Sequence, residues 1–319
     1  MHRIKLLLIA IIVFVSAGMA MAAGNELVKK ETFVFAIEQG DTLRMDKYSG
    51  IVTTGGPRPV VLFAFGGGFK GGDRATPTYV AFFHKLVEQG YTVVSTDYRT
   101  ALASLSPSQV NSAGAFVSLL QDAIATATFD FCRATRFVID HSEEWNIDSE
   151  RIVACGSSAG AVTVLQAEYM LCQQGNPMKE LLPEGFHYAG VVSFAGAIAS
   201  VGQPKWAQAP CPILMFHGDA DRIVPYEKAV FGDVGLWGSY AICQALDQRD
   251  APHVLYSVNQ AGHEMAERPM RENLWEIMAF LSRLNDENLM RIRHIKEQTT
   301  GEEVPVKAYS LEEYIKANM

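Results

Sequence analysis

The residue whose surroundings best suit it for chemistry is Ser158, at the centre of Gly-Ser-Ser-Ala-Gly at residues 156–160. These residues fit the pattern G-x-S-x-G, in which glycines two before and two after the serine relieve crowding on a very tight turn from a strand into a helix. The apolar run at residues 151–155 predicts the strand, and residues 159–171 predict the helix. We therefore predict that Ser158 is a nucleophile presented on this turn. The alternative is a helix start that merely contains small residues.

A run of glycines at residues 65–69 (Phe-Gly-Gly-Gly-Phe) directly follows an apolar segment that predicts a strand at residues 59–65. Main-chain N–H groups with no side chain beside them can come close to the negative charge that develops on a carbonyl oxygen during acyl transfer. A phosphate-binding loop is the alternative, but the run lacks a following G-K-S/T and the glycine spacing of dinucleotide sites. The glycine run therefore favours an oxyanion-binding loop.

An acid comes from the segment His-Gly-Asp-Ala-Asp-Arg-Ile-Val-Pro at residues 217–225, just past another predicted strand. A carboxylate in such a loop can hold an imidazole in the tautomer that is needed to take a proton. Asp219 and Asp221 both qualify on chemistry alone. We expect His217 to stabilise the loop rather than to take part in the reaction.

The base is expected from His263, which follows the last predicted strand at residues 253–258. Of the eight histidines in the chain, His263 is the one at a strand end downstream of both the serine and the acid. A histidine that is only structural is the alternative for any of the eight. The chain order serine, acid, histidine favours a triad instead.

The elements that must position these side chains alternate along the chain. Strands are expected at residues 32–37, 43–48, 59–65, 91–96, 151–155, 189–194, 212–216 and 253–258, the first two as a hairpin. Helices are expected at residues 79–89, 159–171, 238–249 and 273–284, and as a pair within 113–145 that is broken near 128–130. Strands separated by helices imply parallel crossovers, so the sequence predicts a three-layer α/β sandwich with a mostly parallel central sheet.

These four segments together resemble the α/β-hydrolase family, particularly the bacterial esterases near the hormone-sensitive-lipase and feruloyl or acetyl-xylan esterase groups. The resemblance covers roughly residues 32–284. It implies the α/β-hydrolase fold for this region, and it selects Asp221 over Asp219 because the family pattern reads H-G-x-x-D-x-x-V-P. The implied triad is Ser158, His263 and Asp221.

The same resemblance assigns the oxyanion hole to the main-chain amides of Gly67, Gly68 and Ala159. The family loop usually reads H-G-G-G, and here Phe65 stands where the histidine would be. This departure removes a side chain that orders the loop and leaves the amides in place. The Asp-Tyr-Arg segment at residues 97–99 also matches the family, and we interpret it as structural.

The implied reaction is a two-step acyl transfer that hydrolyses carboxylic esters and needs no metal or organic cofactor. The substrates implied are small-molecule or polysaccharide-linked esters, with acetyl or feruloyl groups as examples. Trp206 and Trp237 are further hypothetical pocket residues, although burial in the core is an equal alternative. A serine peptidase, a thioesterase or dienelactone hydrolase, and a non-catalytic binding protein are the alternative functions.

The beginning of the chain predicts export. A basic start is followed by an apolar stretch at residues 6–15 and by small residues ending at Ala22, which is typical of a secretory signal peptide at residues 1–22. A retained membrane anchor is the alternative, but the apolar stretch is short of the ~20 residues that a spanning helix needs. We therefore expect a periplasmic or extracellular protein with a catalytic domain at residues 23–284 and a charged extension at 285–319.

The composition of the chain disfavours some classes of binding partner. The formal net charge is −8 and becomes −10 once the signal segment with Arg3 and Lys5 is removed, which argues against nucleic acid. Cys155 is predicted to be a small buried hydrophobe. The spacing of the five cysteines matches no metal knuckle, and pairing among four of them stays open: Cys132, Cys172, Cys211 and Cys243. The sequence does not decide the oligomeric state, or whether the extension packs back, contacts another subunit or hangs loose.

Overall fold

The computed structural model describes residues 28–38, 40–51, 55–105, 112–284, 291–298 and 311–318. The predicted signal peptide at residues 1–22 lies outside these residues.

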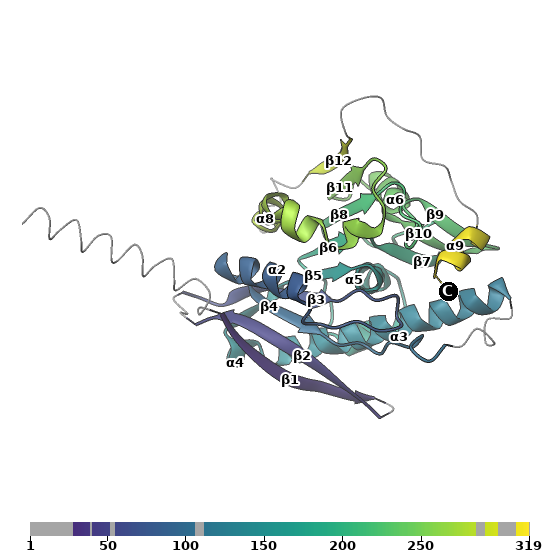
Figure 1. Ribbon diagram of the computed structural model, residues 1–319. Coiled ribbons are helices and arrows are strands. Elements are labelled where there is room, and N and C mark those ends of the chain that lie inside the picture. Colours follow the sequence, from purple (N-terminus) through teal and green to yellow (C-terminus); the bar gives the residue numbers. More distant parts are fainter. Residues whose placement is uncertain are drawn as a thin grey trace, which may run out of the picture.

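A central nine-stranded sheet organises the described part of the molecule, with strand order β1-β2-β4-β3-β5-β6-β8-β11-β12 (Figure 1). β1 pairs antiparallel with β2, β2 pairs antiparallel with β4, and all later neighbours are parallel. The strands are β1 (Val28–Glu38), β2 (Asp41–Gly50), β3 (Arg58–Ala64), β4 (Thr92–Thr96), β5 (Ile147–Ser157), β6 (Gly190–Phe194), β8 (Ile213–Gly218), β11 (His253–Val258) and β12 (Ile292–Glu297).

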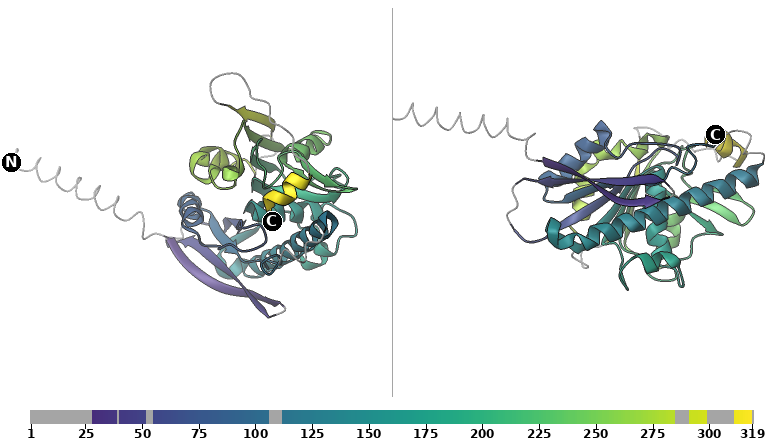
Figure 2. Two further views of the ribbon diagram at one scale, coloured as in Figure 1. Left: turned by 45° about the vertical axis from the view of Figure 1, so that its right-hand side comes forward. Right: turned by 90° about the horizontal axis from the view of Figure 1, so that it is seen from below.

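Helices cover both faces of this sheet, with α3, α5 and α6 on one face and α2 and α8 on the other (Figures 1 and 2). The helices are α2 (Pro77–Glu88), α3 (Ala113–Asp140), α4 (Ser142–Trp145), α5 (Ala159–Leu171), α6 (Ser239–Asp247), α7 (Pro269–Glu272), α8 (Leu274–Leu281) and α9 (Leu311–Asn318), with short 3-10 turns η3 (Pro177–Leu181) and η4 (His263–Ala266). The predicted three-layer sandwich with a mostly parallel sheet is confirmed.

The central strands are buried along their whole length because both of their faces are covered. Every residue of β4 and of β6 is buried, as expected for parallel strands between two helical layers.

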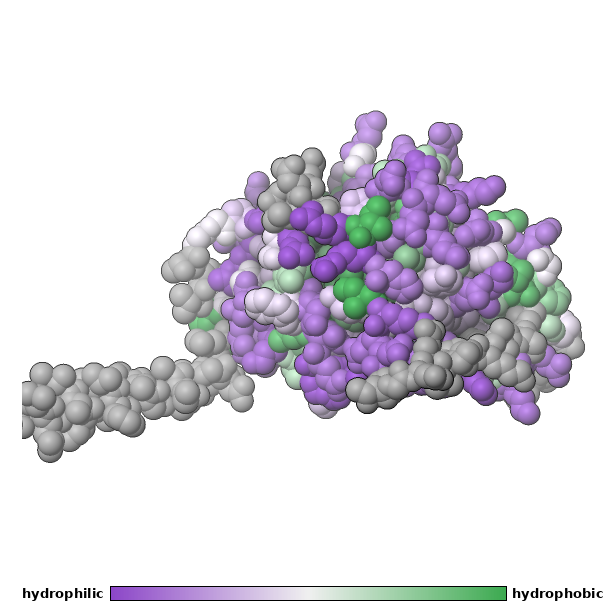
Figure 3. All heavy atoms as spheres, turned by 90° about the horizontal axis from the view of Figure 1, so that it is seen from above, coloured by the Kyte–Doolittle hydropathy of each residue, from purple (hydrophilic) through white to green (hydrophobic). Residues whose placement is uncertain are grey.

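The face of the molecule that is seen from above is mostly hydrophilic, and its hydrophobic residues form small separate patches (Figure 3).

The predicted break near residues 128–130 is wrong, because α3 runs unbroken through it. The hydroxyl of Thr128 donates to the carbonyl of Ile124 one turn earlier, so this side chain is satisfied inside the helix. The carboxylate of Asp130 is fully buried and accepts hydrogen bonds from the guanidinium of Arg99, at 2.7 Å for Nη2. Of the residues that suggested a break, Asp130 therefore attaches α3 to the segment after β4.

α3 is also long and apolar enough, by length and composition alone, to cross a membrane. The buried core helices of other proteins can have the same length and composition. In this structure α3 packs along α5 and beside β1, with buried residues that include Phe116, Ile124 and Phe131. This packing accounts for its apolar composition.

Two features of the second half of the chain do not follow from the sequence pattern. A second, three-stranded sheet has the order β7 (Ala197–Val201), β10 (Val234–Gly238) and β9 (Lys228–Phe231). The described parts of the extension pack on the rest of the molecule, since β12 pairs with β11 and α9 lies beside α3 and β9 (Figure 2).

We expect Asp130→Ala to lower the free energy of unfolding by about 3 kcal/mol, because it leaves the Arg99 charge without its buried partner. The Arg99 side chain is only 13% exposed, so water replaces the lost contact poorly. Chemical denaturation measures the change. The matched control is Asp140→Ala, which removes a half-exposed pair with Arg136 and should cost less than about 1 kcal/mol. Equal losses in the two variants would contradict this interpretation.

Candidate active site

Ser158 lies on a sharp turn between β5 and α5. Its backbone has φ 51° and ψ −118°, a conformation that non-glycine residues rarely adopt. A Cβ on Gly160 would lie 2.1 Å from the carbonyl oxygen of Ala64, and a Cβ on Gly156 would lie 2.4 Å from the carbonyl oxygen of Gly160. The two glycines therefore let the start of α5 approach the end of β3, which puts Ser158 beside the glycine loop.

The structure brings Ser158, His263 and Asp221 together in one chain of hydrogen bonds. Ser158 Oγ lies 2.8 Å from His263 Nε2, and His263 Nδ1 lies 2.7 Å from Asp221 Oδ2. The three residues come from the turns that follow β5, β11 and β8. Because these strands are parallel, their carboxyl ends meet at one edge of the sheet.

Asp221 is fixed before it meets the histidine. Its Oδ1 accepts main-chain hydrogen bonds from Ile223 and Val224, and its side chain is fully buried. Burial alone would raise the pKa of Asp221, but hydrogen bonds from His217 and His263 outweigh burial and hold the pKa well below its usual range. The carboxylate is therefore ionised and oriented toward the imidazole.

Asp219, the other carboxylate left open by chemistry alone, points elsewhere. Its two oxygens accept hydrogen bonds from the side chain of Asn259 and the main chain of Gln260. Asp219 thus ties the loop after β8 to the loop after β11. The structure pairs Asp221, and not Asp219, with the histidine.

His217 is a buried structural residue of the same loop. Its Nδ1 lies 2.8 Å from Ser239 Oγ, and its Nε2 lies 3.1 Å from the carbonyl oxygen of Val224. These contacts connect the end of β8 with the start of α6, as the sequence led us to expect.

The glycine loop is held open beside Ser158. A Cβ on Gly67 would lie 2.0 Å from the carbonyl oxygen of Gly71, so no other residue fits there without moving the loop. Among the described residues, no group accepts a hydrogen bond from the main-chain N–H of Gly67, Gly68 or Ala159. Ala159 is also the first residue of α5, where the helix dipole favours negative charge.

Phe65 stands where the family's loop usually has a histidine, and its contacts order the glycine loop. Its ring stacks on Tyr98 with centroids 4.5 Å apart, and the Tyr98 hydroxyl donates to the Phe65 carbonyl at 2.8 Å. Burial raises the pKa of Tyr98 well above its ordinary value, so the hydroxyl keeps the proton that it donates. The Asp-Tyr-Arg segment at residues 97–99 thereby orders the loop.

A second chain of hydrogen bonds, which the sequence did not predict, joins the parts of the site. The main-chain N–H of Gly66 donates to Tyr79 Oη at 3.2 Å, Tyr79 Oη donates to Ser157 Oγ at 3.2 Å, and Ser157 Oγ donates to the carbonyl of Ala266 at 2.8 Å. It links the glycine loop, α2, the serine turn and η4, which carries His263. Tyr79 sits in an ordinary apolar helix pattern, so no local signal distinguishes it.

Two hollows meet at Ser158 and Gly68. The first, called the apolar pocket, has a volume of about 180 Å³ and is lined mainly by apolar side chains, among them Phe116, Leu120, Val162, Leu236 and Tyr314. The second, called the polar cleft, has a volume of about 710 Å³ and also contains His263. Its other lining residues include Asp73, Thr76, Glu264, Glu267, Arg268 and Arg271. The site therefore offers Ser158 an apolar side and a polar side.

Trp206 and Trp237 line neither of these two hollows, so the hypothesis that they form the pocket is wrong. Trp206 is buried against Tyr169, with ring centroids 5.0 Å apart. Trp237 is buried in β10 with the Lys228 amine over its ring. Both tryptophans belong to the packing of the region around the site.

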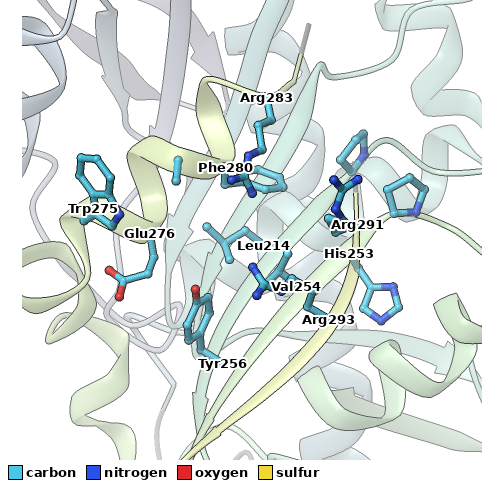
Figure 4. Close-up of a pocket in the computed structure, with 13 residues that line it drawn as sticks. Leu214, His253, Val254, Tyr256, Trp275, Glu276, Phe280, Arg283, Arg291 and Arg293 are labelled. Atoms are coloured by element: carbon cyan, nitrogen blue, oxygen red, sulfur yellow. The ribbon is translucent and has the colours of Figure 1, made fainter. Parts of the chain in front are cut away.

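Another pocket, shown in Figure 4, shares no lining residue with the serine turn. It begins at the amino ends of β8 and β11, whereas Asp221 and His263 follow the carboxyl ends of these strands. Its lining residues include Trp275, Arg283, Arg291 and Arg293, and none of the residues predicted for the site.

Known proteins resemble part of this chain in sequence. A family model described as alpha/beta hydrolase fold matches residues 61–203, which include the glycine loop and the serine turn. Among curated proteins, Fumonisin B1 esterase of Sphingopyxis macrogoltabida is 28% identical over 144 residues, which are 43% of this chain and 24% of that protein. The chain thus spans about a quarter of the length of this curated relative.

Solved structures share the fold at low sequence identity. The propionate-bound esterase Est2 of the Planctomycetes species Thermogutta terrifontis has a TM-score of 0.59 and 19% identity, covering 80% of this chain and 94% of that one. The same esterase phosphorylated by paraoxon has a TM-score of 0.55 and 20% identity, covering 79% and 94%. The α/β-hydrolase fold inferred from the sequence is confirmed.

We expect Asp221→Asn to lower the free energy of unfolding at about pH 7 by about 2 kcal/mol, because it replaces charge-assisted hydrogen bonds. The folded-state pKa of Asp221 lies below the unfolded value of about 4, so its contribution is complete above that value and is lost as pH falls through the folded-state pKa. The difference between wild type and variant should therefore shrink at about pH 3. Urea unfolding at both pH values tests this expectation, which a constant difference would refute.

Proposed function

Since residues 61–203 match a family model of the alpha/beta hydrolase fold and the chain shares this fold with solved esterases, we propose that it is a serine hydrolase that cleaves carboxylic esters. The observation that carries the proposal is the continuous hydrogen-bond chain from Ser158 through His263 to Asp221, beside free main-chain amides. Hydrogen bonds in this arrangement serve acyl transfer, because the serine needs a base to take its proton and the negative substrate oxygen needs hydrogen-bond donors.

In the proposed reaction, His263 keeps its Nδ1 proton and donates a hydrogen bond from it to Asp221, which leaves Nε2 free to accept the proton of Ser158. Ser158 Oγ attacks the ester carbonyl, and the main-chain amides of Gly67, Gly68 and Ala159 stabilise the negative oxygen. His263 then gives its proton to the leaving alcohol. Water repeats the attack on the acyl-enzyme, with His263 as the base, and releases the acid.

The two hollows divide the substrate between acyl and alcohol parts. A cavity of about 150 Å³ lined by aliphatic and aromatic groups takes up benzene. The apolar pocket, at about 180 Å³, therefore suits a short aliphatic acyl chain or one aromatic ring. The polar cleft is large enough for a hydroxylated alcohol such as a sugar unit, so we favour acetyl or small aromatic esters of carbohydrates.

The acyl part would contact the C-terminal helix. Tyr314 of α9 is 4% exposed, lines the apolar pocket, and packs edge-on against Phe116 with ring centroids 6.5 Å apart. Lys70 donates to the carbonyl of Asn318 at 2.6 Å, which ties the end of α9 to the glycine loop. Tyr314 therefore limits the acyl length in this proposal.

We also propose that the enzyme is exported to the periplasm or beyond. Support comes from the signal-peptide pattern at residues 1–22, which lie outside the described residues. In this setting the enzyme meets esters outside the cytoplasm.

The curated relative and the Thermogutta protein are both named as esterases, which agrees with an ester substrate.

Ser158→Ala should reduce hydrolysis of 4-nitrophenyl acetate by several orders of magnitude and abolish labelling by a fluorophosphonate, because it removes the nucleophile. Ser157→Ala is the matched control, since it removes the neighbouring hydroxyl and should still be labelled. Mass spectrometry of the labelled peptide identifies the modified serine. Retained turnover in Ser158→Ala would overturn the assignment. Faster cleavage of a dipeptide amide or a thioester by wild type would favour a peptidase or a thioesterase.

Tyr314→Ala should enlarge the apolar pocket and shift preference toward longer acyl chains. We expect the ratio of kcat/KM for 4-nitrophenyl octanoate over acetate to rise about tenfold, since one methylene in an apolar pocket is worth 10-fold or more. Glu312→Ala changes an exposed residue of the same helix and should leave the ratio unaltered. An unchanged ratio in Tyr314→Ala would remove α9 from the acyl site.

A further inference from the structure

A cluster of metal-binding side chains lies at the carboxyl end of α5, away from the hydrogen-bond chain of Ser158. Glu168 and Cys172 are one turn apart and therefore share a face of the helix. His187 comes from the segment before β6, and Cys211 from the segment before β8. One oxygen of Glu168, Oε1, lies 3.4 Å from His187 Nδ1 and 3.5 Å from Cys172 Sγ, and it accepts the main-chain N–H of Cys211 at 2.9 Å.

The carboxylate of Glu168 is not satisfied by these contacts. Its side chain has no exposed surface, and its second oxygen, Oε2, is buried with no hydrogen-bond partner among the described residues. Burial of a charged group is costly unless the group is paired or coordinates a metal. An ion pair with His187 accounts for Oε1 and leaves Oε2 without a hydrogen-bond partner among the described residues.

The spacing of these atoms matches the ligands of a tetrahedral zinc ion. Zinc lies about 2.3 Å from sulfur and about 2.0 Å from oxygen and imidazole nitrogen, which puts the oxygen about 3.5 Å from the sulfur and about 3.3 Å from the nitrogen. The distances from Glu168 Oε1 are 3.5 Å to Cys172 Sγ and 3.4 Å to His187 Nδ1. All three ligand atoms lie within 4.8 Å of one another.

We propose that Glu168, Cys172 and His187 bind a structural zinc ion, with Cys211 as the fourth ligand. The main-chain N–H of Cys211 donates to Glu168 Oε1 at 2.9 Å, which places Cys211 next to the other three residues. Thiolate and imidazole ligands select a thiophilic divalent cation over magnesium or calcium. Binding displaces the thiol protons to solvent, and the ion compensates the buried carboxylate.

The position of the site gives the ion a structural role. α5 begins at the nucleophilic serine turn and ends at Glu168 and Cys172, so the ion would anchor the far end of this helix. It would join α5 to the segments that lead into β6 and β8. β8 in turn leads into the loop of Asp221, so the ion would stabilise the frame that holds the triad.

A second cluster in the molecule provides the contrast. Cys243, Asp247 and His253 also place their ligand atoms within 4.8 Å of one another. Their sulfur and nitrogen are only 3.2 Å apart, shorter than the roughly 3.6 Å expected across a zinc ion, and Asp247 is 53% exposed. Cys243 and His253 therefore form a thiol–imidazole contact. Cys243→Ser serves as the matched control.

The test uses the full chain, purified under reducing conditions, stripped with a chelator and titrated with Zn²⁺ alone. We expect one equivalent of zinc by elemental analysis, a rise in Tm on binding, and a thiolate-to-metal absorption band when Co²⁺ replaces zinc. His187→Gln and Cys211→Ser change the less buried ligands and should weaken zinc binding at least tenfold while the apoprotein stays folded by circular dichroism. Cys243→Ser should bind zinc as wild type does.

Several results would overturn the proposal. These are less than a tenth of an equivalent of zinc on folded wild type, binding that His187→Gln leaves unchanged, or loss of binding in Cys243→Ser. A Cys172–Cys211 disulfide in the native protein, detected by mass spectrometry of unreduced peptides, would equally replace the metal. None of these readouts depends on esterase activity, so the outcome is independent of the proposed function.

Discussion

The close approach of α5 to the end of β3 is the constraint on which the site depends. Gly160 lies so near the carbonyls of Ala64 and Phe65 that any side chain at this position would collide with the main chain. This contact puts the first residue of α5 next to the glycine loop, and it forces Ser158 into a backbone conformation with positive φ. Pairing of β5 with β3 on one side and β6 on the other stabilises this strained conformation.

The parts of the site are then held in register by two hydrogen-bond chains that leave the serine turn in different directions. One runs from Ser158 to Asp221 and connects the ends of β5, β11 and β8. The other runs from Gly66 through Tyr79 and Ser157 to Ala266, and it connects the glycine loop with the turn of the histidine. Adjacent serines thus have different roles, since Ser158 belongs to the first hydrogen-bond chain and Ser157 to the second.

The features that could be predicted from the sequence are those determined by residues close together in the chain. The glycine spacing around Ser158 and the strands before each site residue follow from short-range rules of backbone geometry and burial. The sequence did not reveal the role of Tyr79 or Tyr314, because each lies in an ordinary apolar pattern and meets the site only through the tertiary fold. The break in α3 was wrong for a related reason, since Asp130 is stabilised inside the helix by Arg99, which is far away in sequence. The cluster around Glu168 was likewise hidden, because three separate segments contribute to it.

The attachment of α9 to the glycine loop has a practical consequence for the handling of this protein. The carbonyl of Asn318 is bound by Lys70, and neighbouring residues of the helix form a wall of the apolar pocket. An affinity tag fused after this helix would emerge at the mouth of that pocket, and a carboxypeptidase that trims the helix would open it. A purification tag is therefore better placed on the amino-terminal side of strand β1.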